Sequence, residues 1–284
     1  MKCLICQSAT APFFAKKGFQ IVRCPDCRLM AVENVPEDLA PYYAEGYFTG
    51  DTALEGYMDY EHDKAPTKDI YRYHLKVMES LTQKKFGWSL FEVGCATGFF
   101  MELAKERGWE VEGIDISAYA VREAEAKGLR VIVGTLEAFT TQKKYDCVAM
   151  HDVIEHVKDP VGLVGRVREL LPSGGLFVIA TPDAGSLWAR VWGKRWHAFV
   201  PPQHLFYFTE KNLTMLLEIE GFEIIHSDHR GKWFTIPYIF RLLFSWTGIR
   251  FFSRLAEWTS RSFLKDQAIP LNVRDTLFLI ARKK

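Results

Sequence analysis

Residues 90–116, LFEVGCATGFFMELAKERGWEVEGIDI, constrain the fold of this chain more than any other segment. A buried-strand pattern leads into a turn bracketed by Gly94 and Gly98. A helical pattern follows, and a second strand ends at Asp115. This order of strand, glycine turn, helix and strand is typical of a nucleotide-binding βαβ unit. The glycines are spaced Gly-x-x-x-Gly, wider than the Gly-x-Gly-x-x-Gly turn of dinucleotide sites, so the turn suits a ligand without a pyrophosphate.

The alternation of strands and helices continues towards the C-terminus. Apolar spacing and turn residues predict helices over 67–81, 118–127, 160–171 and 210–220, and strands over 130–134, 145–150, 176–181, 222–227 and 276–281. Strands that alternate with helices at this spacing predict an α/β fold with a doubly wound, mostly parallel sheet.

Two groups of motifs in this region resemble those of a known enzyme family. EVGCATG followed by GIDIS, and LLPSGGLFVIATPD further on, resemble the class I S-adenosylmethionine (SAM) methyltransferases. The resemblance runs from about residue 90 to the C-terminus. It implies a Rossmann-like sheet of seven strands, in which the last strand lies antiparallel between the two strands before it.

The resemblance also implies which residues bind the cofactor SAM. Gly94 and Gly98 would lie beside its methionyl part, and Asp115 would accept hydrogen bonds from the ribose hydroxyls. A helix N-cap is the other role open to Asp115, but Ser117 is the better cap. The full expected set is Glu92 at the turn or the amino group, Gly94, Gly98, Asp115, Ile116 on the adenine, Leu136 and Glu137 at the adenine edge, and Asp152 facing the methyl-transfer zone.

The polar cluster HDVIEH, residues 151–156, follows the strand expected over 145–150. Its Asp-x-x-Glu-His element resembles that of small-molecule O-methyltransferases of the ubiquinone-biosynthesis type. In that subgroup Asp152, Glu155 and His156 would hold a divalent cation near the acceptor hydroxyl. Without a cation His156 could act as a general base, or the cluster could cap the next loop. His204, in an aromatic segment after the fifth strand, is a further catalytic candidate on a lid, or a structural histidine.

Four of the six cysteines form two Cys-x-x-Cys pairs near the N-terminus: Cys3, Cys6, Cys24 and Cys27. Two such knuckles make a closed four-thiolate site, which predicts a structural Zn²⁺ ion. A short segment without a large core would depend on that ion for its folding. A redox dithiol pair is the alternative, although no βαβ pattern surrounds either knuckle.

These patterns suggest three parts of the chain. Residues 1–30 form the zinc module, 31–80 a tyrosine-rich connector with a helix that covers the cofactor, and 81–284 the methyltransferase domain. The domain carries insertions over 184–208 and 229–272. The aromatic and arginine-rich stretch 233–265 in the second insertion could be a lid, a homodimer surface, or an in-plane membrane anchor that meets a lipid-linked substrate.

Composition narrows the choice of function. Thirty-six basic and 35 acidic residues give a net charge of +1, which does not indicate a nucleic-acid partner. The N-terminus lacks a signal-peptide pattern, so we expect a cytoplasmic protein, with peripheral membrane contact as an alternative. We expect SAM-dependent O-methylation of a small molecule, either a sugar or polysaccharide precursor or a quinone- or polyketide-like acceptor. The alternatives are an RNA methyltransferase that grips RNA with the zinc module, and a non-catalytic scaffold with this fold.

Overall fold

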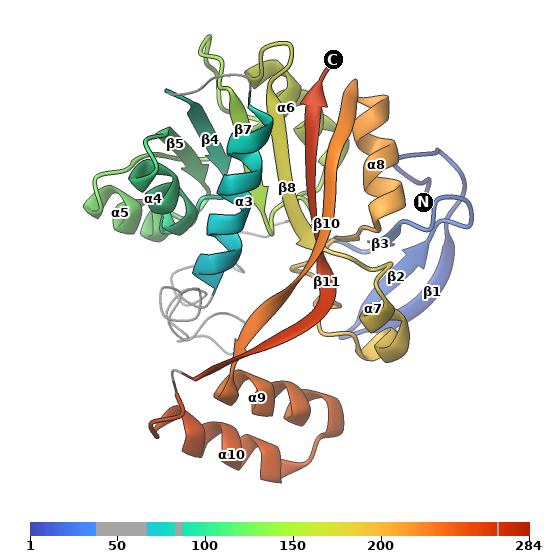
Figure 1. The fold of residues 1–284 in the computed structure, drawn as a ribbon. Coiled ribbons are helices and arrows are strands. Elements are labelled where there is room, and N and C mark those ends of the chain that lie inside the picture. The colour runs from blue at the N-terminus through green and yellow to red at the C-terminus, as the bar shows by residue number, and fades with distance from the viewer. Residues whose placement is uncertain (38–66, 83–86, 266) are drawn as a thin grey trace.

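The computed structural model describes residues 1–37, 67–82, 87–265 and 267–284 (Figure 1). The connector tyrosines between residues 42 and 60, which we expected to pack on the domain or line a pocket, lie outside the described residues.

A seven-stranded sheet forms the centre of the molecule. Its order is β10-β11-β8-β7-β4-β5-β6, and β11 is antiparallel to both of its neighbours. The remaining pairs, β8–β7, β7–β4, β4–β5 and β5–β6, are parallel. The strands are β4 (Ser89–Val93), β5 (Glu110–Asp115), β6 (Arg130–Val133), β7 (Cys147–His151), β8 (Leu176–Pro182), β10 (Phe222–Thr235) and β11 (Ala268–Lys283). The predicted Rossmann-like α/β fold is therefore confirmed, including the position of the last strand.

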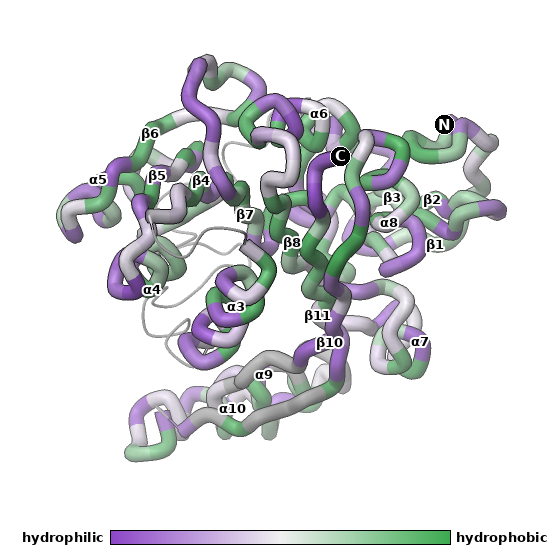
Figure 2. The backbone as a smooth tube through the Cα atoms, turned by 45° about the horizontal axis from the view of Figure 1, so that its top comes forward, coloured by the Kyte–Doolittle hydropathy of each residue, from purple (hydrophilic) through white to green (hydrophobic). Residues whose placement is uncertain are grey.

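Alternating side chains of the central strands divide the interior into two cores. Leu90 packs with α3 (Lys68–Leu81), α4 (Phe99–Glu106) and α5 (Ala118–Ala126) on one face. Phe91 and Val93 pack with α6 (Pro160–Leu170) and α8 (Glu210–Ile219) on the other face. This period of two is what buried strands require, and Figure 2 shows hydrophobic segments concentrated in the central sheet.

Local sequence signals start the helices where expected. The Ser117 hydroxyl accepts from the Ala120 amide at the start of α5, as the sequence predicted. Asp159 caps α6 through the Gly162 amide, with Pro160 in the first turn. Thr209 and Asn212 form a reciprocal capping box on α8. These caps satisfy amide groups that the first helical turn leaves without a partner.

The last two strands are longer than predicted. β10 and β11 pair as far as Thr235 and Ala268, beyond the edge of the main sheet. The resulting antiparallel ribbon carries α9 (Ile236–Thr247) and α10 (Arg250–Ser260) at its far end (Figure 1). The sequence missed the extension because it depends on backbone pairing between distant segments, such as Lys232 with Leu271.

A second sheet links the N-terminus to the first insertion. Its order is β1-β2-β3-β9, where β1 (Ala11–Lys16), β2 (Phe19–Arg23) and β3 (Met30–Val32) come from the N-terminus. β9 (Phe206–Tyr207) comes from the insertion, after α7 (Leu187–Trp192) and the short helix η3 (Gly193–Arg195). Insertion aromatics such as Trp196 and Phe199 share a core with Phe14 and Ile21. The predicted domain boundaries stay predictions, but the N-terminal residues and the first insertion fold together.

None of the helices in the described part of the chain is both long enough and apolar enough to span a membrane.

Candidate active site and metal centre

The glycine turn between β4 and α4 is shaped by the packing of the protein as well as by its backbone. Gly94 and Gly98 have φ angles of +68° and +80°. A Cβ atom on Gly94 would lie 2.5 Å from Val153 Cγ2, and one on Gly98 would lie 2.2 Å from Leu129 Cδ1. Both positions therefore require glycine before any ligand is considered.

Asp115 ends β5 with its carboxylate held by two backbone amides. Oδ2 accepts from the Ala96 amide and Oδ1 from the Ser117 amide, each at 2.8 Å. Burial raises the pKa of the Asp115 carboxyl, and these two hydrogen bonds offset part of that effect. The carboxylate has lone pairs left for ribose hydroxyls. The next residue, Ile116, is 47% exposed and offers an apolar surface beside it.

The two residues expected at the adenine edge differ in their surroundings. The Leu136 side chain is buried in the core with Phe91 and Ile114, so only its backbone is available to a ligand. Glu137 is exposed. Their contacts with adenine stay predictions.

A buried chain of three polar side chains lies behind the glycine turn. Glu92 Oε1 is 3.2 Å from His151 Nδ1, and His151 Nε2 is 3.3 Å from His74 Nδ1. Because a carboxylate accepts, His151 Nδ1 donates to Glu92, and in a neutral His151 ring Nε2 then accepts from His74 Nδ1–H. The His74 ring stacks on Phe278 with 3.7 Å between centroids. The sequence placed His74 only within the helix predicted over 67–81, and its contact with His151 joins residues 77 positions apart.

The predicted catalytic residues Glu155, His156 and His204 come together although they belong to different segments. Each offers a ligand atom within 4.8 Å of the others. His156 Nδ1 lies 2.8 Å from the carbonyl oxygen of Gln203, and its ring meets the His204 ring edge-on at 4.6 Å. Glu155 is 1% exposed; its Oε2 accepts from Thr181 at 2.9 Å, and its Oε1 is 3.9 Å from His156 Nε2.

The contact with Gln203 fixes the tautomer of His156. A carbonyl oxygen can only accept, so Nδ1 carries the proton and the neutral ring has its lone pair on Nε2. That atom faces Glu155, which makes it suitable either to accept a proton or to bind a cation. Asp152 lies half-buried on the preceding turn with φ +55°, and its amide donates to Ala180. Its role at the methyl-transfer zone stays a prediction.

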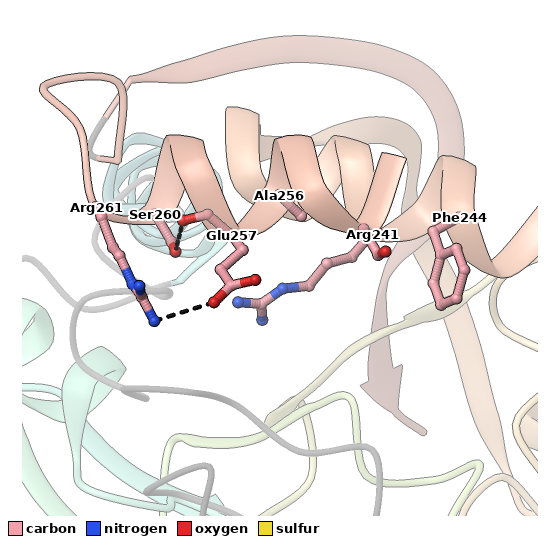
Figure 3. A pocket seen from close by; sticks show the side chains of 7 residues that line it. Arg241, Phe244, Ala256, Glu257, Ser260 and Arg261 are labelled. Carbon is pink, nitrogen blue, oxygen red and sulfur yellow. Dashed lines mark hydrogen bonds and ion pairs between the residues drawn. The ribbon is translucent and has the colours of Figure 1, made fainter. Parts of the chain in front are cut away.

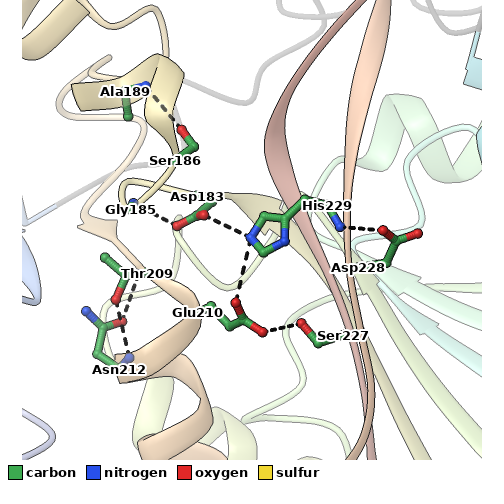
Figure 4. Close-up of polar contacts among 10 residues, drawn as sticks. All are labelled: Asp183, Gly185, Ser186, Ala189, Thr209, Glu210, Asn212, Ser227, Asp228 and His229. Atoms are coloured by element: carbon green, nitrogen blue, oxygen red, sulfur yellow. Dashed lines mark hydrogen bonds and ion pairs between the residues drawn. The ribbon is translucent and has the colours of Figure 1, made fainter. Parts of the chain in front are cut away.

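A further acid–histidine pair at the end of β8 was not predicted from the sequence. His229 Nε2 lies 3.0 Å from Asp183 Oδ2 and 3.9 Å from Glu210 (Figure 4). Asp183 Oδ1 accepts from the Gly185 amide at 2.7 Å, and burial raises the pKa of the Asp183 carboxyl. The pair ties β10 to the end of β8 and to the start of α8. Its members lie 46 residues apart, so no local motif could reveal it.

The four N-terminal cysteines converge as the spacing predicted. Their sulfurs lie within 4.8 Å of one another, with Cys3–Cys27 at 3.4 Å and Cys6–Cys24 at 3.3 Å. A tetrahedron with Zn–S bonds of ~2.3 Å separates its sulfurs by ~3.8 Å, so the cluster fits Zn²⁺. Each knuckle is closed by the same turn: Gln7 and Arg28 follow the second cysteine with φ near +64°, and their amides donate to the carbonyl of the first.

The methyltransferase domain family matches residues 65–227. A ubiquinone biosynthesis O-methyltransferase of Bradyrhizobium sp. (strain ORS 278) is 27% identical over 167 residues, which cover 52% of this chain and 65% of that relative. The chain therefore spans just under two thirds of the relative's length.

Two solved structures have a similar fold. A SAM-dependent methyltransferase of Thermotoga maritima has a TM-score of 0.53 at 17% identity, covering 79% of this chain and 94% of that one. Magnesium protoporphyrin IX methyltransferase of Synechocystis PCC 6803, solved with bound SAH, has a TM-score of 0.52 at 15% identity, covering 84% and 91%. With the family match over more than half of its length and this fold, the chain belongs to the class I SAM-dependent methyltransferases.

Proposed function

We propose that the protein transfers the methyl group of SAM to a hydroxyl oxygen of a small molecule. The expected cofactor residues lie at or after the carboxyl ends of β4, β5, β6 and β7. Glu155 and His156 follow β7, and His204 belongs to the insertion after β8, so the cluster also comes from segments that leave the carboxyl edge of the sheet. Open α/β sheets bind their ligands at this edge. The family supplies the donor, and the cluster supplies a group able to activate an acceptor.

The observation that carries the proposal is the tautomer of His156, held by the carbonyl of Gln203. Its Nε2 accepts the proton of the acceptor hydroxyl. The buried carboxylate of Glu155 stabilises the imidazolium that results. SAM, when bound, supplies an electrophilic methyl group: the new oxygen–carbon bond forms as the sulfur–carbon bond breaks, and the proton stays on His156.

A phenolic, quinone-like acceptor fits this base better than a sugar. A phenol has a pKa of ~10 and an imidazole one of ~6.5, so the proton transfer is only moderately uphill, whereas an alcohol is far less acidic. The relative from Bradyrhizobium, named as a ubiquinone biosynthesis enzyme, supports the same class. We rank a sugar or polysaccharide precursor second.

We further infer that the same three side chains are able to hold a divalent cation. Glu155 offers a carboxylate, and His156 and His204 offer imidazole nitrogens, all within 4.8 Å. This donor set suits first-row transition metals. Such an ion would lower the pKa of an acceptor hydroxyl. His156 cannot bind the ion and accept the proton through the same Nε2. Removal of the ion with a chelator therefore distinguishes the two roles: activity is lost if the ion is needed and retained if His156 is the base.

The four cysteines support a structural Zn²⁺ ion. Cys3, Cys24 and Cys27 are buried, Cys6 is half-buried, and four thiolates leave no coordination position for a substrate. A cytoplasmic location stays a prediction.

A labelling experiment tests the proposal against its alternatives. The protein is incubated with methyl-labelled SAM and, separately, a catechol-type quinol, a sugar and total RNA. We expect label in the phenol and none in RNA. Label in RNA that falls steeply with salt would favour an RNA methyltransferase. SAM binding by calorimetry with no labelled product from any acceptor or from cell extract would favour the scaffold.

A further inference from the structure

The helical hairpin formed by residues 236–265 has more apolar surface than its position can bury. In α9 only Arg241, Ser245 and Thr247 are neither apolar nor aromatic. Among the α9 side chains that the structure describes, only that of Pro237 is buried. A helix this apolar normally lies inside a protein or a membrane. The hairpin is held at the far end of the β10–β11 ribbon, away from the two main cores (Figure 1).

The second helix combines exposed aromatic and cationic residues on one face. Phe251 is 61% exposed and Trp258 is 60% exposed. Arg254 in α10 and Arg261 at its C-cap are exposed at the interleaved positions, so the four residues recur every three or four positions. Phe263, just after the helix, is 83% exposed. Helices that lie in a membrane interface combine exposed aromatic rings with Lys or Arg, and a long arginine side chain beside an inserted ring can still reach the headgroups.

The charge of the hairpin differs from that of the rest of the chain. It contains five basic residues and one acidic residue, a net charge of +4, although the whole chain has a net charge of only +1. The single acid, Glu257, pairs with Arg261 at 3.0 Å. Figure 3 shows Arg241 on the same side of the hairpin, and all three border an open hollow of about 490 Å³. This concentration of positive charge is complementary to anionic lipid headgroups.

The length of the helices decides how they would meet a bilayer. α9 has 12 residues and α10 has 11. At ~1.5 Å per residue each is under 20 Å long, well short of the ~30 Å hydrocarbon core. The helices would therefore lie in the plane of the interface, with aromatic rings inserted and arginines at the headgroups.

The ribbon leads from the hairpin to the acceptor side of the domain. β10 and β8 are both antiparallel to β11, so β10 runs parallel to β8 and leaves the sheet at its carboxyl edge. Asp115 and His151 are the last residues of β5 and β7 at this same edge, and the turn that holds His156 comes directly after β7. A bilayer bound to the hairpin would thus face the side where the acceptor enters.

We propose that residues 236–265 bind an anionic lipid bilayer in the plane of its interface, and that the methyl acceptor is delivered from that bilayer. Delivery of the acceptor from the bilayer rests on the function proposed above. Binding of the bilayer by the hairpin does not depend on that function.

Vesicle flotation with the full-length protein tests the surface. The probes are vesicles of phosphatidylcholine alone and of phosphatidylcholine mixed with phosphatidylglycerol. We expect the protein to float with the mixed vesicles and to be released by high salt. The double variants Phe251→Ser/Trp258→Ser and Arg250→Gln/Arg254→Gln should each bind roughly tenfold less or weaker still. The matched control is Leu187→Ser/Val191→Ser on α7, where the two side chains are 77% and 69% exposed, and it should bind like the wild type.

Three results would overturn the surface proposal. One is wild-type protein that stays unbound with both kinds of vesicle, and another is a control variant that loses as much binding as the hairpin variants. The third is light scattering that shows a dimer which Phe251→Ser/Trp258→Ser converts to a monomer without vesicle binding, since a second copy would then cover the hairpin.

Methyl transfer to a soluble, short-chain phenol separates this proposal from the proposed function. Hairpin variants should keep that activity. On a long-chain acceptor embedded in vesicles, their turnover should be slower than that of the wild type. Equal loss on both acceptors would contradict delivery from the bilayer. Vesicle binding by a protein that methylates neither acceptor would support bilayer binding by residues 236–265 and would overturn the proposed function.

Discussion

The backbone amide of Leu205 donates a hydrogen bond to the carbonyl oxygen of Glu155 at 2.8 Å. Leu205 follows His204 and precedes β9, whose Phe206 pairs with Ala31 of β3. The β3 strand, which follows the four-cysteine cluster, is therefore linked through β9 by main-chain hydrogen bonds to Glu155, and His204 directly precedes this link. The four-cysteine cluster is in this way connected to the shape of the candidate site.

Loss of zinc should accordingly impair methyl transfer as well as stability. The change is Cys24→Ser, which removes one ligand of the cluster. We expect zinc below one ion per chain, lower thermal stability, and turnover that falls more than SAM affinity does, because the β3–β9 pairing supports His204 rather than the glycine turn. Metal analysis, thermal unfolding and calorimetry measure the three quantities.

Cys147→Ala is the matched control for that variant. Cys147 is fully buried in the main sheet, outside the cluster. Its truncation should cost roughly 1 kcal/mol of stability and leave the zinc content unchanged. If Cys24→Ser keeps wild-type turnover after losing its zinc, the proposed link between module and site is wrong.

The carboxylate of Asp115 should be needed for SAM binding. Asp115→Asn retains the size of the side chain but loses its charge and places an amide nitrogen against one of two backbone N–H groups. We expect the Kd for SAM to rise at least roughly tenfold, about 1.4 kcal/mol, by calorimetry. Asp159→Asn is the control because asparagine also caps α6. Unchanged affinity in Asp115→Asn would remove this residue from the cofactor site.

His74 should make the stability of the protein depend on pH. Burial, followed by electrostatic interaction with His151 and Arg230, holds the pKa of His74 well below its usual value. The unfolded chain takes up a proton below about pH 6.5 while the folded one does not, so acidification favours unfolding. His74→Phe, which preserves the stack on Phe278, removes this dependence.

Urea unfolding at pH 7 and pH 5 measures that difference. At pH 7 we expect His74→Phe to be less stable by about 1–2 kcal/mol, because His151 loses a buried donor. From pH 7 to pH 5 the free energy of unfolding of the wild type should fall by about 2 kcal/mol more than that of the variant. Parallel pH profiles for the two proteins would contradict the assignment of His74 as a neutral buried donor.

Much of the fold could be predicted because its signals are local. The glycine turn, the caps at Ser117 and Thr209, and the apolar strands each depend on neighbours within a few residues. The two Cys-x-x-Cys knuckles are local as well. The order of the last two strands came from family resemblance, since nothing in residues 276–281 alone indicates an antiparallel strand.

The relations that shape the site could not be predicted because they join distant segments. The contact of His156 with Gln203 spans 47 residues, and that of Asp183 with His229 spans 46. Pairing of β3 with β9 depends on strands of three and two residues, which are too short to show a pattern. The sequence named His156 and His204 as separate candidates, and only the fold brings them together.

The central claim is that Nε2 of His156 accepts the proton of the acceptor, and His156→Asn tests it most directly. The asparagine amide can still donate to the Gln203 carbonyl in place of Nδ1, but it has no basic nitrogen. Turnover should be measured with a weakly acidic phenol and with a strongly acidic nitrophenol, at saturating SAM. We predict a fall of roughly 10²–10⁴-fold with the first phenol, substantial recovery with the second, and unchanged SAM affinity. Wild-type turnover with the weakly acidic phenol would contradict the account.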